Sequence, residues 1–164
     1  MFKCGDAVMY STAGACKIAT ETEKEYFGKT EVCFVLEPIF CGNMKIYVPK
    51  SNDKLISKMR RMMTKENLLS LIKNLPEEGE EYIPDDALRR QKYGEIIALC
   101  DQMRILGIIK TLYQKKIEQT ENKKRLHQCD EYLLREAERI LYGEIAFVFD
   151  ISPDEVHEFI LENK

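Results

Sequence analysis

The sequence lacks several features that would place it in a familiar class of proteins. It has no uninterrupted apolar run of about 18 residues, so we expect no membrane-spanning helix. Its first residues include no apolar segment of the kind that a signal peptide carries. Its net charge is only −3, which excludes a general polycation, so any contact with nucleic acid has to come from a local basic patch.

Histidine is scarce, and the cysteines show no metal-binding spacing. The two histidines, His127 and His157, lie outside any HExxH pattern, and we interpret both as surface or helix-end residues. None of the six cysteines forms a CxxC pair, and those in strand-like segments should behave as small buried apolar residues. Reduced thiols without an export signal indicate a cytoplasmic protein. We therefore predict no metal site and no cofactor.

Sequence motifs of catalysis are also absent. The chain contains no GxxxxGK[ST] phosphate loop, no GxGxxG turn and no GxSxG elbow. Paired carboxylates such as Asp85 and Asp86 stand at an expected helix start, where the helix dipole accounts for them. One enzymatic alternative stays open, a thiol enzyme using Cys100 or Cys129, which would need a lowered thiol pKa beside a cation. The sequence otherwise predicts a protein that is not an enzyme.

The first part of the chain has the pattern of a small β domain. Strand-like segments alternate with turn residues and are rich in β-branched and aromatic side chains; they cover residues 6–10, 15–20, 31–37 and 44–48. Pro38 and Pro49 should end the last two strands, because proline lacks a donor for the sheet. The charged stretch Glu21–Lys29, which holds Gly28, is expected to form a hairpin loop. This spacing predicts a small curled sheet or barrel.

From Thr64 onward the apolar period becomes that of helices. Helices are expected after Thr64 and over residues 86–99, 102–118 and 130–149, with a last one opened by a capping box at Ser152-Pro153-Asp154-Glu155. The acidic segment between Pro76 and Pro84 is aperiodic, which indicates a linker. The predicted fold class is α+β, with a β domain over 1–63, a short helix and linker over 64–84, and a helical domain over 85–164.

Three segments are candidate binding surfaces. The segment Lys45–Val48 is a candidate edge strand, which could accept a strand from a protein partner, unless it lies inside the sheet. Arg89, Arg90 and Lys92 open a helix beside Tyr93 and suit phosphate contacts, although composition alone favours a solvated helix face. A further basic cluster, residues 122–125, lies in an expected loop, where it either reaches a phosphate backbone or serves solubility.

Four motifs resemble the CarD/CdnL family of bacterial transcription regulators, and they follow one another in the family's order. FKCGDAVMY at residues 2–10, followed by Gly14, is similar to F-x-x-G-D-x-V-x-Y-x-x-x-G. The others are residues 42–49, ending in Val-Pro, the pair Arg89-Arg90, and residues 137–146, similar to A-R-x-I-L-x-x-E-L-A.

The resemblance implies a transcription regulator with two binding surfaces. In the family, an N-terminal Tudor-like β-barrel, shared with the transcription–repair coupling factor, docks on the beta subunit of RNA polymerase by extending a sheet. A C-terminal helical domain contacts promoter DNA, mainly its backbone, at the upstream edge of the transcription bubble. The resemblance implies polymerase-binding roles for Lys24, Lys45, Ile46, Tyr47 and Val48. It implies DNA-binding roles for Leu88, Arg89, Arg90 and Lys92.

The chain also departs from the family pattern. Members place a Trp before the Arg pair, where it wedges into the duplex, but this chain has no Trp, and Ala87 and Leu88 stand there. Leu88 is a weaker apolar wedge. Tyr47 and Glu131 stand where members carry basic residues. These changes keep open a second function, an adaptor on RNA polymerase that makes no productive DNA contact.

Overall fold

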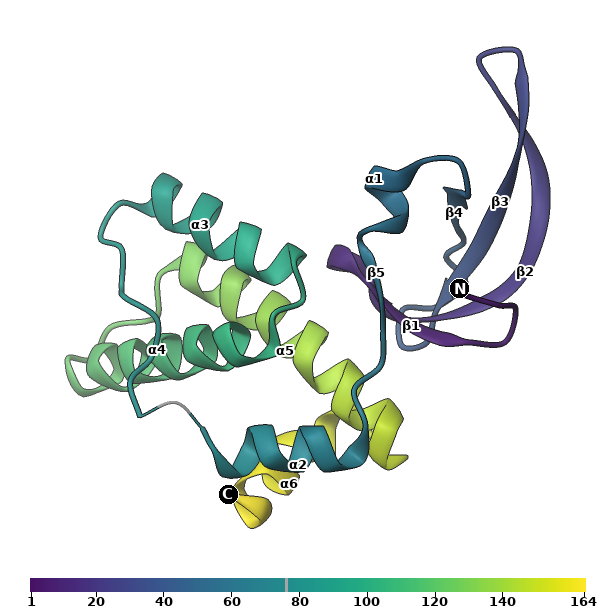
Figure 1. Cartoon of the computed structure of the whole chain (residues 1–164). Coiled ribbons are helices and arrows are strands. Elements are labelled where there is room, and N and C mark those ends of the chain that lie inside the picture. The colour runs from purple at the N-terminus through teal and green to yellow at the C-terminus, as the bar shows by residue number, and fades with distance from the viewer. Residues whose placement is uncertain (76) are drawn as a thin grey trace. The chain divides into compact units, whose positions relative to one another are not determined.

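The computed structural model describes residues 1–75 and 77–164 and leaves the Thr12 side chain aside. The chain forms two compact units, Met1–Met62 and Met63–Lys164. All strands lie in the first unit and the long helices in the second, as Figure 1 shows, so the predicted α+β class is confirmed. No helix in the described ranges is both long and apolar enough to cross a membrane.

The N-terminal unit is built on one antiparallel sheet. Its strands are β1 (Ala7–Tyr10), β2 (Gly14–Tyr26), β3 (Lys29–Pro38), β4 (Ile46–Pro49) and β5 (Met59–Arg61). Their order in the sheet is β4-β3-β2-β1-β5, so β4 and β5 are its two edges and the sheet is not closed. The predicted Tudor-like barrel is therefore not confirmed. The strand ends at Pro38 and Pro49 agree with the prediction.

The core of this unit consists of buried apolar side chains from every strand of the sheet; they are Val8, Cys16, Ile18, Phe34, Leu36, Val48 and Met59. Leu55 and Ile56 of the short helix α1 (Asp53–Ile56) pack against this cluster. The sequence did not reveal β5, which has three residues, two of them arginines. β5 is a strand because it pairs with β1, with Val8 opposite Arg61.

The prediction of a loop over Glu21–Lys29 is wrong, because most of these residues belong to strands. β2 and β3 continue as a two-stranded arm, and the turn consists only of Phe27 and Gly28, with φ of 51° and 76°. Charged residues suit this arm because many of its side chains are exposed, and Lys24 lies opposite Glu31. A high charge density therefore does not exclude a strand in a part of the sheet that extends beyond the hydrophobic core.

The helical unit agrees closely with the pattern of the sequence. Its helices are α2 (Lys65–Lys73), α3 (Asp86–Ala98), α4 (Gln102–Glu121), α5 (Gln128–Phe149) and α6 (Val156–Asn163). Side-chain oxygens of Thr64, Asp85 and Asp101 accept backbone N–H bonds at the first three starts. The capping box at Ser152 and Glu155 is present and opens a 3-10 turn immediately before α6.

The segment that precedes α3, predicted as a linker, is held against the helices. The backbone N–H of Glu80 donates to Gly107 O of α4 at 3.2 Å, and Thr111 Oγ1 donates to Glu80 O at 2.6 Å. Tyr93 of α3 donates its hydroxyl hydrogen to Glu81 O at 2.8 Å. Residues 77–84 have neither helix nor strand, but they belong to the helical unit; Pro76 lies outside the described residues.

Candidate protein-docking edge and nucleic-acid face

The predicted docking strand lies at an edge of the sheet. β4 pairs with β3 alone, in a register that sets Ile46 opposite Leu36 and Val48 opposite Phe34. Val48 is buried in the core, Ile46 and Tyr47 are half-buried, and Lys45 is exposed just before the strand. In the described part of the chain no strand covers the other side of β4, so the alternative of an interior strand is excluded.

The hydrogen-bond pattern of β4 shows which backbone groups face the open side. Lys50 N donates to Val32 O at 2.9 Å, which makes these two residues a hydrogen-bonded pair of the antiparallel ladder. Such pairs recur at every second residue, so the main chains of Val48 and Ile46 bond to β3. The N–H and C=O of Tyr47, between them, therefore point to the open edge.

Two lysines accompany this edge. Lys24 lies on β2, not in a loop, and its Nζ is 3.5 Å from the centroid of the Tyr47 ring. This is a cation–π contact between the arm and the edge strand. Lys45 Nζ lies 3.5 Å from Glu37 Oε1, with both side chains about half exposed. The fold thus brings the predicted docking residues together at one edge of one sheet.

The comparison with protein families concerns the same unit. Residues 2–62 match the family model described as the CarD-like/TRCF RID domain. The N-terminal unit is a CarD-like/TRCF RID domain. This family is a non-catalytic interaction domain, and the match indicates an RNA polymerase-interacting, transcription-related role for this unit. No curated protein matches the chain.

The predicted DNA-contacting residues lie outside the RID domain, at the start of α3. Leu88 is 44% exposed, and Arg90 and Lys92 are exposed as well. Arg89, in contrast, is completely buried. Neighbouring positions on a helix point in different directions, so a run of basic residues cannot all face one ligand.

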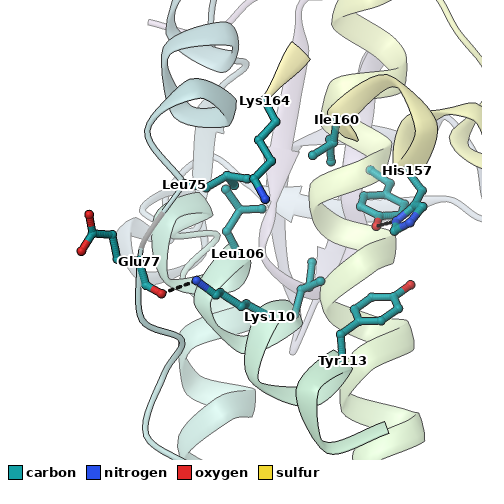
Figure 2. A pocket seen from close by; sticks show the side chains of 10 residues that line it. Leu75, Glu77, Leu106, Lys110, Tyr113, His157, Ile160 and Lys164 are labelled. Carbon is teal, nitrogen blue, oxygen red and sulfur yellow. Dashed lines mark hydrogen bonds between the residues drawn. The ribbon is translucent and has the colours of Figure 1, made fainter. Parts of the chain in front are cut away.

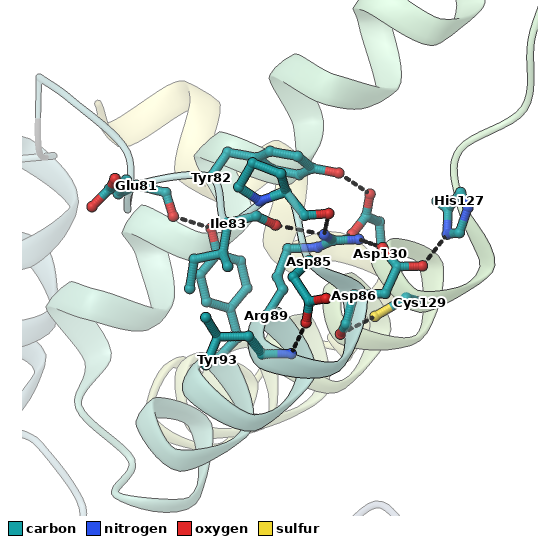
Figure 3. Close-up of polar contacts among 12 residues, drawn as sticks. Glu81, Tyr82, Ile83, Asp85, Asp86, Arg89, Tyr93, His127, Cys129 and Asp130 are labelled. Carbon is teal, nitrogen blue, oxygen red and sulfur yellow. Dashed lines mark hydrogen bonds and ion pairs between the residues drawn. The ribbon is translucent and has the colours of Figure 1, made fainter.

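Arg89 is the centre of a polar network inside the helical unit (Figure 3). Its Nε donates to Asp130 Oδ1 at 2.7 Å, and its two terminal nitrogens donate to Asp86 Oδ1 at 2.7 Å and to Ile83 O at 2.6 Å. The hydroxyl of Tyr82 donates to Asp130 Oδ2 at 3.1 Å, and the Tyr82 ring lies under the guanidinium. The network joins the segment before α3 to α3 and α5.

The electrostatics of this network keep Arg89 in place. Burial by itself lowers the pKa of the Arg89 guanidinium, but the hydrogen bonds to Asp86 and Asp130 outweigh that effect, and the pKa is raised. Its nitrogens are directed at acceptors inside the protein, so it cannot reach a phosphate while the unit is folded. We therefore correct the prediction for Arg89, which has a structural role and not a DNA-binding one.

The remaining basic face has a neighbour that the sequence did not reveal. The Arg90 guanidinium lies 4.9 Å from the ring centroid of Tyr132, a half-exposed residue of α5. Arg90, Tyr132 and Arg135 line one groove, and so do the acidic residues Asp86 and Glu131. A spacing of three places Tyr132 and Arg135 on one face of α5, but only the packing of α5 on α3 brings that face to Arg90.

The alternative thiol chemistry finds no support at Cys129 or Cys100. Burial raises the pKa of the Cys129 thiol, which is the opposite of what a nucleophile needs, and Cys100 is buried. His127 lies with Nδ1 3.1 Å from Asp86 Oδ2. Among the described residues no group of three or more His, Cys, Asp or Glu is arranged to hold a metal ion.

Proposed function

We propose that this chain is a transcription regulator that docks on the beta subunit of RNA polymerase through β4 of its RID domain. One observation carries the proposal: within a domain of an RNA polymerase-interacting family, β4 is an edge strand whose Tyr47 main chain faces outward. A strand of the partner would continue the sheet by pairing with these groups.

The candidate docking residues would have different roles at this edge. Tyr47 offers one N–H and one C=O to the incoming strand, while Ile46 and Val48 fix β4 to β3. Lys24 and Lys45 carry positive charge on the same edge and suit acidic side chains of the partner, which steer association.

A pair of variants at Tyr47 tests the docking strand. Tyr47→Pro removes the outward N–H and the ring, whereas Tyr47→Val removes only the ring. Proline is tolerated at an edge where the N–H faces solvent, so both variants should keep the fold. We expect Tyr47→Pro to bind purified RNA polymerase roughly two- to tenfold more weakly than Tyr47→Val, since a hydrogen bond contributes about 0.5–1.5 kcal/mol.

The measurement is biolayer interferometry with immobilised polymerase, and unchanged thermal melting curves establish that both variants are folded. Equal affinities of the two folded variants would show that no partner strand pairs with Tyr47. Competition by the isolated beta-subunit domain identifies the subunit.

We further infer that the helical unit contacts promoter DNA near the bubble edge, mainly through the backbone and without sequence specificity. Leu88, Arg90 and Lys92 are the residues for this contact, because they are exposed on α3. Arg90 stacked on Tyr132 combines a phosphate-binding cation with an aromatic surface, and the nearby Arg135 adds a second cation.

A second candidate function, an adaptor on RNA polymerase without productive DNA contact, has support from two observations. Burial of Arg89 removes one of the three cations that the sequence suggested for the DNA face. Asp86 and Glu131 line the same groove as Arg90 and oppose a polyanion. The salt dependence of promoter complexes distinguishes the two functions.

A further inference from the structure

The helical unit contains a second concave site, which shares no lining residue with the Arg90 groove (Figure 2). It is a cavity of about 360 Å³ between α4, α5, α6 and the segment after α2. This volume lies in the range of small-molecule sites, about 300–1,000 Å³, and cavities between the helices of a bundle are a common place for them.

The walls of the cavity are largely apolar or aromatic. The residues concerned are Leu75, Leu106, Ile109, Tyr113, Tyr142 and Ile160. Leu106, Ile109 and Ile160 are each at most 9% exposed, so their side chains are fixed by packing before any ligand arrives. A preformed apolar wall favours the transfer of an apolar group from water without a cost for ordering the site.

One side of the cavity is positively charged. Lys110 donates from Nζ to the backbone oxygen of Glu77, while the Glu77 carboxylate points away from the cavity (Figure 2). The Lys164 side chain extends toward the same region. The ammonium groups of Lys110 and Lys164 both carry positive charge at this end of the cavity. These two lysines therefore favour an anionic group at this end.

The aromatic side of the cavity is held rigid by its own polar contacts. The His157 ring stacks on Tyr113 with centroids 5.7 Å apart, and its Nδ1 lies 3.2 Å from the Tyr142 hydroxyl oxygen. Tyr113 donates its hydroxyl hydrogen to Glu138 Oε1 at 2.7 Å. Because the hydroxyls of Tyr113 and Tyr142 and the Nδ1 of His157 already have partners in the wall, this side offers a ligand mainly ring faces.

We propose that this cavity binds a small amphipathic carboxylate, with its apolar body against Leu106, Ile109 and Ile160 and its carboxylate at Lys110 and Lys164. The apolar wall would contact the apolar body of such a ligand, and the cationic side would bind its carboxylate. The proposal does not depend on polymerase or DNA binding, because it uses none of the residues assigned to those surfaces.

The test compares octanoate with octanamide, its neutral isostere, by titration into the ¹⁵N- and methyl-labelled chain. We expect saturable shifts at the Ile109 and Ile160 methyl groups, and at least fivefold tighter binding of octanoate than of octanamide. The variant Lys164→Gln should weaken octanoate severalfold and leave octanamide unchanged, because only the carboxylate uses the charge.

The variant Lys124→Gln is the matched control, since it removes one exposed lysine that does not line the cavity. Equal binding of both probes, shifts located elsewhere, or shifts that do not saturate would each overturn the proposal. An unchanged octanoate affinity of folded Lys164→Gln and Lys110→Gln would overturn it as well, and melting curves establish that these variants are folded.

Discussion

Arg89 and Asp130 form a buried ion pair, with Nε and Oδ1 2.7 Å apart and side-chain exposures of 0% and 2%. The same guanidinium binds Asp86 of its own helix and the main chain of Ile83. One residue thus fixes α3, α5 and the preceding segment together. Because breaking a buried pair leaves its partner charged and unsolvated, the network should be sensitive to loss of either member.

Replacing Arg89 should therefore destabilise the helical unit more than replacing any exposed arginine beside it. We expect Arg89→Ala to lower the free energy of unfolding by about 3–5 kcal/mol, because Asp130 keeps its charge without a partner. The stability of Arg89→Lys should lie between those of the unmodified chain and Arg89→Ala. An ammonium group keeps the charge but cannot reproduce the forked hydrogen bonds of the guanidinium. Urea unfolding measures these values. The exposed Arg90→Ala is the matched control, and a loss no larger for Arg89→Ala than for Arg90→Ala would refute the structural role.

Two glycines provide an opposed pair of variants. At Gly79 an added Cβ would lie 2.1 Å from Thr111 Oγ1 and 3.0 Å from Gly107 O, so Gly79→Ala should push the segment away from α4 and cost about 1–3 kcal/mol. At Gly94, inside α3, a Cβ meets nothing within 4 Å. Gly94→Ala should stabilise by about 0.5–1 kcal/mol through helix propensity. Thermal unfolding of both variants measures these changes in stability. Changes of the same sign in the two variants would contradict the packing described.

Alkaline pH should unfold the helical unit through its buried tyrosines. Burial raises the pKa of Tyr93 from 10.0 to about 12, and burial likewise raises that of Tyr113 to about 12. The folded state then holds protons that the unfolded state releases, so the stabilisation is complete below pH 10 and falls as pH rises toward 12. For each such tyrosine, the free energy of unfolding should fall by about 1.4 kcal/mol per pH unit in that window.

Tyr93→Phe should remove one such contribution and flatten the decline of stability above pH 10, at a cost at neutral pH of about 0.5–1.5 kcal/mol for the bond to Glu81 O. Denaturant unfolding at several pH values gives the slope, and absorbance of tyrosinate follows the ionisation itself. An identical slope in the variant would count against the raised pKa of Tyr93.

The helices were predictable because their signals are local. Side-chain caps at Thr64, Asp85 and Asp101 and the capping box at Ser152 depend only on residues within a turn of each helix start. The edge position of β4 was not predictable from its pattern alone. Alternating side chains indicate a half-buried strand, but pairing partners are set by the whole sheet.

The failures of prediction have one physical origin, which is that contacts between distant segments override local patterns. Arg89 looked like an exposed cation of a basic cluster, but Asp130, 41 residues further on, provides a buried partner. Tyr132 and Arg90 meet only because α5 packs on α3. The arm of β2 and β3 resembles a loop in sequence because its residues are highly charged, although they pair as strands beyond the core.

Salt dependence should decide whether the helical unit contacts DNA. Each phosphate neutralised contributes about −0.9 to the slope of log affinity against log salt, so Arg90→Gln with Lys92→Gln should make the slope shallower by up to about 2. The measurement is the affinity of the polymerase–promoter complex with the protein present, at several salt concentrations. The matched control, Lys123→Gln with Lys124→Gln, changes net charge equally at the loop cluster. If the Arg90 and Lys92 pair leaves the slope unchanged, these two residues neutralise no phosphate and the adaptor function is favoured, because each phosphate contact that is lost has to make the slope shallower.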